Sequence, residues 1–89
     1  MKITYDPNAD ALYVSVQPVG ENGAGQTEVD EAGVIIDTDA SGRPRGYEFL
    51  SVRSSGIPTG ALPADVADAI QRFIANGALE AGKYVETEY

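Results

Sequence analysis

The stretch GVIIDTDASGRPRGYEFLSV, residues Gly33 to Val52, decides the fold because it contains two strands and the turn between them. The consecutive β-branched residues Val34 to Ile36 are typical of a strand that is apolar on both faces, and such a strand is usually central in a sheet. The segment Asp39 to Gly42 begins with Asp and ends with Gly, as tight turns often do. A second strand follows from Arg45 to Val52, with its two aromatic residues on one face. We therefore expect an antiparallel hairpin.

The same stretch has the spacing of an EF-hand calcium loop from Asp37 to Glu48. An EF-hand needs a helix on each side of the loop, whereas both flanks here favour strands. Pro44 occupies the eighth place, where a backbone N–H normally pairs with a sister loop. Gly42 can instead adopt a positive φ and close a hairpin with a bulge. The hairpin is the better interpretation, and weak cation binding by Asp37, Asp39 and Glu48 is the alternative left open.

Three further segments have strand character. From Ala11 to Gln17 the apolar residues at even positions point one way and Tyr13 points the other, which predicts a strand with one buried face. Lys2 to Tyr5 reads as a short first strand, and Gln26 to Asp30 could form another short one.

A helix is expected at 63–77. It opens at Pro63 and stops at Asn76 and Gly77. Its apolar residues recur at helical spacing, at Val66, Ile70, Phe73 and Ile74. The tail 78–89 alternates in a way that fits either a final edge strand or a disordered end.

These elements predict an α+β fold in a single domain, residues 1–89. We expect a four-stranded antiparallel meander in residues 1–52, with the helix 63–77 packed on one face. A short C-terminal strand in the tail 78–89 is a further option.

Composition excludes several kinds of function. The chain of 89 residues has no cysteine and no histidine, which removes disulfides, thiolate nucleophiles and the commonest metal ligand. It has no long apolar run, and its start MKITYDP lacks the apolar centre of a signal peptide, so we expect a cytoplasmic protein. Without such a run we expect no membrane partner. The formal net charge of −8 argues against binding nucleic acid; it would favour a basic partner or simply keep a small protein soluble.

Two segments that resemble reactive or binding sites are better explained as turns and loops. Asp6 and Asp10 are paired carboxylates, which can do acid–base work, but they also suit the turn between two strands. The glycine-rich segment Gly20 to Gly25 lacks the Lys-Ser/Thr of a phosphate-binding loop and is expected to be an exposed loop. We expect no catalytic residue, no metal ligand and no cofactor.

Five residues are candidates for an interaction surface: Tyr13, Tyr47, Arg43, Arg45 and Arg53. Tyrosine is frequent in interfaces, so the two tyrosines would form a partner surface if both lie on the face that the helix leaves uncovered. Core packing is the alternative for them. The arginines lie near one hairpin of an acidic chain and are either solvated or a contact for an acidic group. A sheet with one uncovered apolar face also predicts a homodimer.

The segments YDPNADALYV, Tyr5 to Val14, and VDEAGVIIDTDASGRPRGYEFLSV, Val29 to Val52, resemble a small family of uncharacterised, mostly bacterial and phage-borne proteins, the domain-of-unknown-function family numbered 2283. The resemblance covers about the first 52 residues. It implies a compact antiparallel sheet and a protein-binding role, with small toxin-like proteins as one class of partner. It implies no catalytic residues, because the family has none assigned.

Three functions are compatible with these observations. The first is a non-enzymatic interaction module that neutralises a basic, toxin-like partner. The second is a small-molecule or ion-binding domain that uses the acidic residues of the hairpin or the arginine group. The third is an enzyme that works with carboxylates alone, at Asp6 and Asp10.

Overall fold

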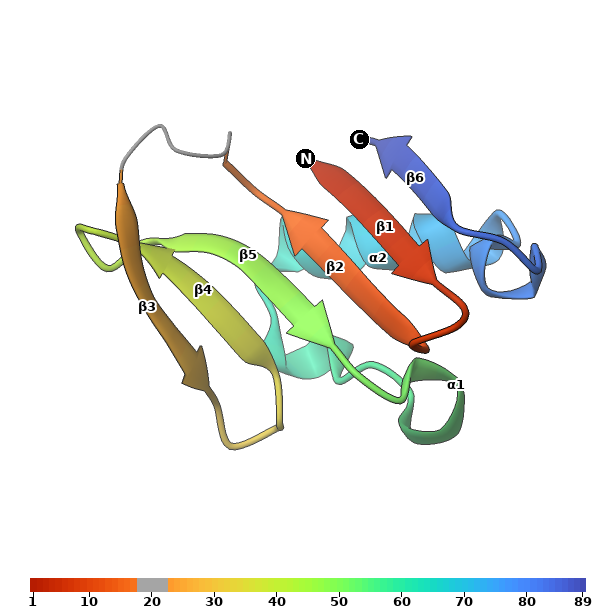
Figure 1. Cartoon of the computed structure of the whole chain (residues 1–89), viewed down its shortest axis with the longest axis horizontal. Helices are drawn as coiled ribbons and strands as arrows, with labels where there is room; N and C mark the ends of the chain where they lie inside the picture. Colours follow the sequence, from red (N-terminus) through yellow and green to blue (C-terminus); the bar gives the residue numbers. More distant parts are fainter. Residues whose placement is uncertain (18–22) are drawn as a thin grey trace.

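The computed structural model describes residues 1–17 and 23–89. These residues form one sheet of six antiparallel strands and one main helix (Figure 1). The strands are β1 (Lys2–Asp6), β2 (Ala11–Ser15), β3 (Ala24–Val29), β4 (Ile35–Asp39), β5 (Pro44–Phe49) and β6 (Val85–Glu88). The helices are α1 (Val52–Ser55), α2 (Ala64–Ala75) and two 3-10 turns, η1 (Thr59–Ala61) and η2 (Ala78–Glu80).

The order of strands in the sheet is β3-β4-β5-β2-β1-β6. The predicted α+β class and antiparallel sheet are confirmed, but the four-stranded meander is wrong in two respects. The weak candidate at 26–30 and the tail both supply strands, which makes six in the described part of the chain. The sheet also joins a hairpin, β1–β2, to a meander, β3–β4–β5, through pairing of β2 with β5. Alternation along a strand determines which face is buried, but it does not determine the neighbouring strand.

The core lies between the sheet and α2, which runs behind the strands in Figure 1. The helix contributes Val66, Ala69, Ile70 and Phe73, each at most 3% exposed. The sheet contributes alternate residues of three neighbouring strands: Ile3, Tyr5, Leu12, Val14, Tyr47 and Phe49. Burial of each large apolar side chain stabilises the fold by about 1.5–3 kcal/mol. The helix predicted at 63–77 is therefore placed as expected, on one face.

Three turns of the sheet are built in the same way. Asp6, Asp30 and Asp39 each accept, at 2.9 Å, a hydrogen bond from the backbone N–H two residues further along the chain. Aspartate stabilises a turn in this manner because its short side chain reaches the nearby backbone. Part of the acidic excess therefore has a structural role. The predicted β4–β5 hairpin is confirmed, with Gly42 at φ 88° in its turn.

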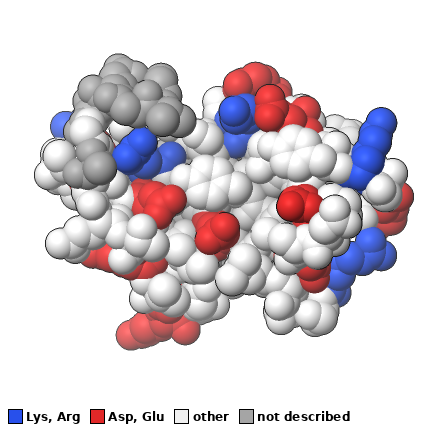
Figure 2. Space-filling model, viewed as in Figure 1, with Lys and Arg blue, Asp and Glu red and all other residues white. Residues whose placement is uncertain are grey.

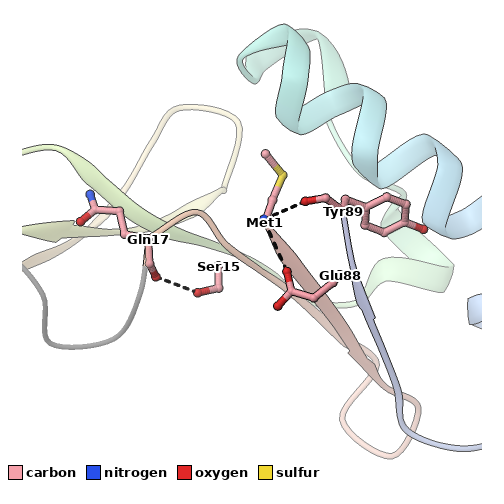
Figure 3. Close-up of polar contacts among 5 residues, drawn as sticks. All are labelled: Met1, Ser15, Gln17, Glu88 and Tyr89. Carbon is pink, nitrogen blue, oxygen red and sulfur yellow. Dashed lines mark hydrogen bonds and ion pairs between the residues drawn. The ribbon is translucent and has the colours of Figure 1, made fainter.

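The tail forms β6 and completes the sheet beside β1. Lys2 pairs with Glu88 and Tyr5 with Val85. The backbone N–H of Tyr89 donates to the Met1 carbonyl at 2.6 Å. The Met1 amino group donates to the Tyr89 carbonyl at 2.9 Å (Figure 3). The Glu88 carboxylate lies 3.5 Å from the same amino group. The alternation of the tail was thus the signal of an edge strand.

Part of the loop predicted at 20–25, residues 20–22, lies outside the described residues, and β3 begins at Ala24. Within residues 1–17 and 23–89, no helix combines the length and the apolar character that crossing a bilayer requires.

Candidate functional site

The face of the sheet opposite α2 consists of two rows of cross-strand neighbours, and we call it the open face. One row runs Val29, Ile35, Glu48, Tyr13, Thr4 and Glu86. The other runs Thr27, Asp37, Gly46, Ser15, Lys2 and Glu88. In the described part of the chain no helix or strand packs over these rows (Figure 1). Figure 2 looks onto this face, where acidic side chains are spread across the middle and basic ones lie towards the rim.

Tyr13 is the central side chain of the open face, and its ring lies flat on Gly46 of the neighbouring strand. A Cβ atom added at Gly46 would stand 1.9 Å from the Tyr13 hydroxyl oxygen and 2.3 Å from its Cζ. Only glycine leaves room for the ring at this position. An aromatic side chain that covers a strand glycine also restores packing that the glycine lacks.

The hydroxyl of Tyr13 donates a hydrogen bond to Oδ2 of Asp37 at 3.0 Å. The other oxygen of that carboxylate, Oδ1, accepts a hydrogen bond from the Thr27 hydroxyl at 2.8 Å. The polar chain Tyr13–Asp37–Thr27 therefore reaches from β2 across β5 to β4 and β3. It holds Tyr13 in a fixed orientation on the open face.

Tyr13 stays protonated at neutral pH. Burial of the ring, the hydrogen bond to Asp37 and the charge of that carboxylate together raise the pKa of Tyr13 to about 12. Arg45 opposes the shift and Glu48 adds to it. The phenol therefore acts as a hydrogen-bond donor and as an aromatic surface, not as a base.

Glu48 lies directly opposite Tyr13 and is partly buried. Among residues 1–17 and 23–89, its carboxylate makes no hydrogen bond and no ion pair. A carboxylate only accepts hydrogen bonds, so an unpaired one beside an aromatic ring is ready to receive an external donor.

Arg45 lies on β5, three residues before Glu48, at a register shift between β4 and β5. It is partly buried and, with Tyr13, Thr27 and Asp37, lines a small cavity of about 180 Å³. Because the bulge breaks the regular alternation of the strand, the Arg45 side chain lies on the open face.

The five predicted surface residues do not form one patch. Tyr13 and Arg45 lie together on the open face, and Arg43 is exposed at the nearby hairpin turn. Tyr47 faces α2 and is only 5% exposed, so it belongs to the core. For Tyr47 the structure therefore shows the alternative of core packing, and only Tyr13 of the two tyrosines lies on the open face.

Arg53 lies in α1, after the end of β5, and takes part in a structural network. Its guanidinium donates to the Leu79 carbonyl at 2.8 Å, and its backbone N–H donates to the Asp10 carboxylate at 3.1 Å. Asp10 also accepts a hydrogen bond at 2.7 Å from the hydroxyl of Tyr5, which is fully buried. The bond to Asp10 and burial raise the pKa of Tyr5. The interpretation of Asp6 and Asp10 as turn residues is confirmed.

The acidic residues of the EF-hand spacing point in different directions. Asp37 and Glu48 lie on the open face, whereas Asp39 is 2% exposed inside the hairpin turn. The Asp39 carboxylate accepts hydrogen bonds from the Ser41 hydroxyl at 2.6 Å and from the backbone N–H of Arg43 at 2.9 Å. The Ser41 hydroxyl is the main cause that lowers the pKa of Asp39 to about 2. Across the described ranges, no three acidic side chains are grouped as a metal site would need.

Sequence reasoning missed the partnership of Tyr13 with Gly46 and Asp37. Position 46 is a glycine inside a predicted strand, and such a glycine often marks a close approach of another group. That was the available signal, but it does not say which group approaches.

Comparison with known proteins identifies a family for most of the sheet. A family model described as a protein of unknown function, DUF2283, matches residues 2–53. The chain belongs to the DUF2283 family. The match spans β1 to β5 and the start of α1, so the resemblance seen in the sequence is confirmed. No curated protein and no solved structure matches the chain.

Proposed function

We propose that this DUF2283 protein is a non-enzymatic binding module that holds a basic protein partner on its open face. The observation that carries the proposal is Glu48, a partly buried carboxylate with no partner in the described part of the chain, directly opposite the fixed ring of Tyr13. Such a carboxylate gains most from a charged donor supplied by another molecule.

An arginine side chain fits this arrangement better than a lysine. Its planar guanidinium can lie over the ring of Tyr13, since cation–π contact is favourable within about 6 Å of the ring centroid. Its forked N–H groups can at the same time donate to Glu48. The net charge of −8 would speed the approach of a basic protein, and a basic member of the small toxin-like class implied by the family resemblance would be such a partner.

The state of the polar groups supports binding over catalysis. Tyr13 keeps its proton at neutral pH. Asp39 and Asp10 already accept hydrogen bonds from their own turns and network. With no histidine and no cysteine in the chain, the commonest general base and thiol nucleophiles are missing as well.

The test is titration of a fluorescent arginine-rich peptide with wild-type protein, Glu48→Gln and the control Glu80→Gln. Glu80 is exposed on η2, so both changes remove one negative charge. We expect Glu48→Gln to weaken binding by about 5- to 30-fold, because it removes one partner of a charged hydrogen bond. Glu80→Gln should change the affinity by less than about twofold, the effect of a screened distant charge.

A lysine-rich peptide of equal length and charge is the matched ligand control. Weaker binding of the lysine peptide, with little dependence on Glu48, would support recognition of a guanidinium. Equal losses in the two glutamine variants would mean that only net charge attracts the peptide, and the proposal would fail. If the wild-type protein passes this test, capture of bound proteins from host lysate at low and high salt would identify its natural partner.

Small-molecule binding is the second candidate, favoured by a separate cavity of about 440 Å³. It lies between the β3–β4 turn and the segment after β5, and Val34, Phe49, Leu50 and Ile57 line it. Its volume is in the usual range for ligand sites, about 300–1,000 Å³. A thermal-shift screen with metabolites and divalent cations tests this function, because a ligand of the native state raises the melting temperature.

A further inference from the structure

The described sheet ends in two edge strands, β3 and β6, and the two edges differ in charge. An edge strand presents unpaired N–H and C=O groups, to which another chain can add a strand. Natural proteins discourage such pairing with charged side chains along the edge. The residues of each edge therefore indicate which one is open to a partner.

In β3, the backbone N–H and C=O groups of two residues point away from the rest of the sheet. The N–H of Asp30 donates to the Val34 carbonyl at 3.0 Å, and antiparallel pairs alternate between bonded and non-bonded. Glu28 therefore bonds to β4, while the N–H and C=O groups of Thr27 and Val29 point away from it. Val29 is 67% exposed, so its side chain leaves room for a second strand beside it.

Gln26 confirms this alternation. Its N–H donates to the Thr38 hydroxyl at 3.0 Å, and that hydroxyl donates back to the Gln26 carbonyl at 3.0 Å. Both backbone groups of Gln26 thus face β4, as its position next to Thr27 requires.

We propose that β3 pairs antiparallel with β3 of a second copy of this chain, about a two-fold axis at Thr27. In this register the outward groups of Thr27 bond to those of Thr27 in the other copy. Gln26 lies opposite Glu28, and Gly25, which lies in the register shift between Ala24 and Thr27, comes opposite Val29. No two like charges face each other, and a threonine pair at the centre is favourable in a sheet. The proposal goes beyond partner binding and leaves the open face free.

The other edge excludes the same arrangement. The N–H of Tyr89 donates to the Met1 carbonyl, so by alternation Glu86 and Glu88 carry the outward groups of β6. A two-fold pairing centred on residue 86, 87 or 88 sets glutamate opposite glutamate. Like charges directly opposite each other destabilise a strand pair. Self-pairing is therefore favoured at β3 alone.

The first test is sedimentation equilibrium of wild type and two charge variants at Gln26, an exposed position. Gln26→Glu sets two glutamates opposite each other twice in the dimer, whereas Gln26→Lys creates two opposite-charge pairs. We expect Gln26→Glu to raise the dissociation constant of the dimer and Gln26→Lys to lower it. Each change should be roughly 2- to 30-fold, the range that two such cross-strand pairs allow. Gln71→Glu and Gln71→Lys, on the exposed side of α2, change net charge equally and should have smaller effects.

Salt separates this association from binding of a basic partner. Two copies of charge −8 repel, so added salt should tighten the dimer, whereas it should weaken the arginine-peptide complex. Hydrogen exchange gives a second measurement. The amides of Thr27 and Val29 should become protected as concentration rises, while those of Glu86 and Glu88 should not.

Either of two results would overturn the inference. One is a monomer from micromolar to millimolar concentration at both low and high salt. The other is a dimer whose affinity moves in the same direction in both Gln26 variants, or whose protected amides lie on β6.

Discussion

The two faces of the sheet come from the same alternating strands, but different interactions order them. On the covered face, apolar side chains such as Val14 and Phe49 pack against α2 with at most 3% of their surface exposed. On the open face, order comes from one ring, one glycine and one hydrogen-bonded carboxylate: Tyr13, Gly46 and Asp37. Substitutions among closely packed core side chains cost much stability. Substitutions beside a local polar arrangement, such as the one around Tyr13, cost little.

The largest expected loss tests the covered face. Phe73→Ala removes a helix side chain that is 1% exposed and leaves a cavity against the sheet. We expect the free energy of unfolding to fall by about 3–5 kcal/mol, measured by urea denaturation at neutral pH. A loss below 1 kcal/mol would show that α2 adds little to the core.

The next loss tests the open face. Gly46→Ala places a methyl group within 1.9 Å of the Tyr13 hydroxyl oxygen and must displace the ring. We expect a loss of about 1–3 kcal/mol, as for other overpacked sites. The double variant with Tyr13→Ala is the control, because there the methyl group meets no ring. If Gly46→Ala costs as much in that background, the close approach of Tyr13 is not the cause.

A smaller effect is expected when only the hydroxyl is removed. Tyr13→Phe keeps the ring on Gly46 but loses the bond to Asp37, at a cost of about 0.5–1.5 kcal/mol. The folded-state pKa of about 12 lies above the ordinary 10.0, so the native state holds the proton more tightly. Tyr13 therefore contributes this stability fully below pH 10 and loses it as pH rises towards 12.

The free energy of unfolding, measured at intervals through the alkaline range, checks the direction of this pH dependence. The wild type should lose more stability than Tyr13→Phe between neutral pH and pH 12, although both retain the raised pKa of Tyr5 and of Tyr47. Parallel alkaline curves would contradict the assignment of the shift to Tyr13.

The smallest change in stability is expected for Glu48, the residue proposed to bind the partner. Glu48→Gln changes a carboxylate that makes no hydrogen bond or ion pair within the described residues. The free energy of unfolding should therefore change by no more than about 0.5 kcal/mol. Combined with weaker binding of the arginine-rich peptide, this result would separate the binding group from the scaffold. A loss above 1 kcal/mol would instead assign Glu48 a structural role.

Local patterns predicted the elements near each other in the chain. The β-branched run and the Asp-led turn predicted the β4–β5 hairpin, and helical spacing from Val66 to Phe73 predicted α2 on one face. Asp6 was recognised as a turn residue for the same reason, since its bond to the backbone N–H of Asn8 is a local feature, whereas the bonds of Asp10 to Tyr5 and Arg53 reach beyond the turn.

Long-range pairing could not be predicted in this way. The tail was ambiguous because β6 is a strand only beside β1, where Lys2 meets Glu88 from the other end of the chain. Alternation placed Tyr13 opposite the apolar face of its strand, but it left open whether Tyr47 lies on the surface or, as the structure shows, packs on α2. Their difference depends on the strands and helix around them, which a single sequence does not specify.

The sequence by itself determined the class of fold, the acidic character and the absence of histidine and cysteine chemistry. These follow from composition and short periodicities, which act within a few residues. Only the tertiary structure decided that β2 lies between β1 and β5, that the ring of Tyr13 rests on Gly46, and that Glu48 stands beside it without a partner in the described chain. Those features arise where separate strands meet, because their contacts are selected by packing of the whole sheet against α2.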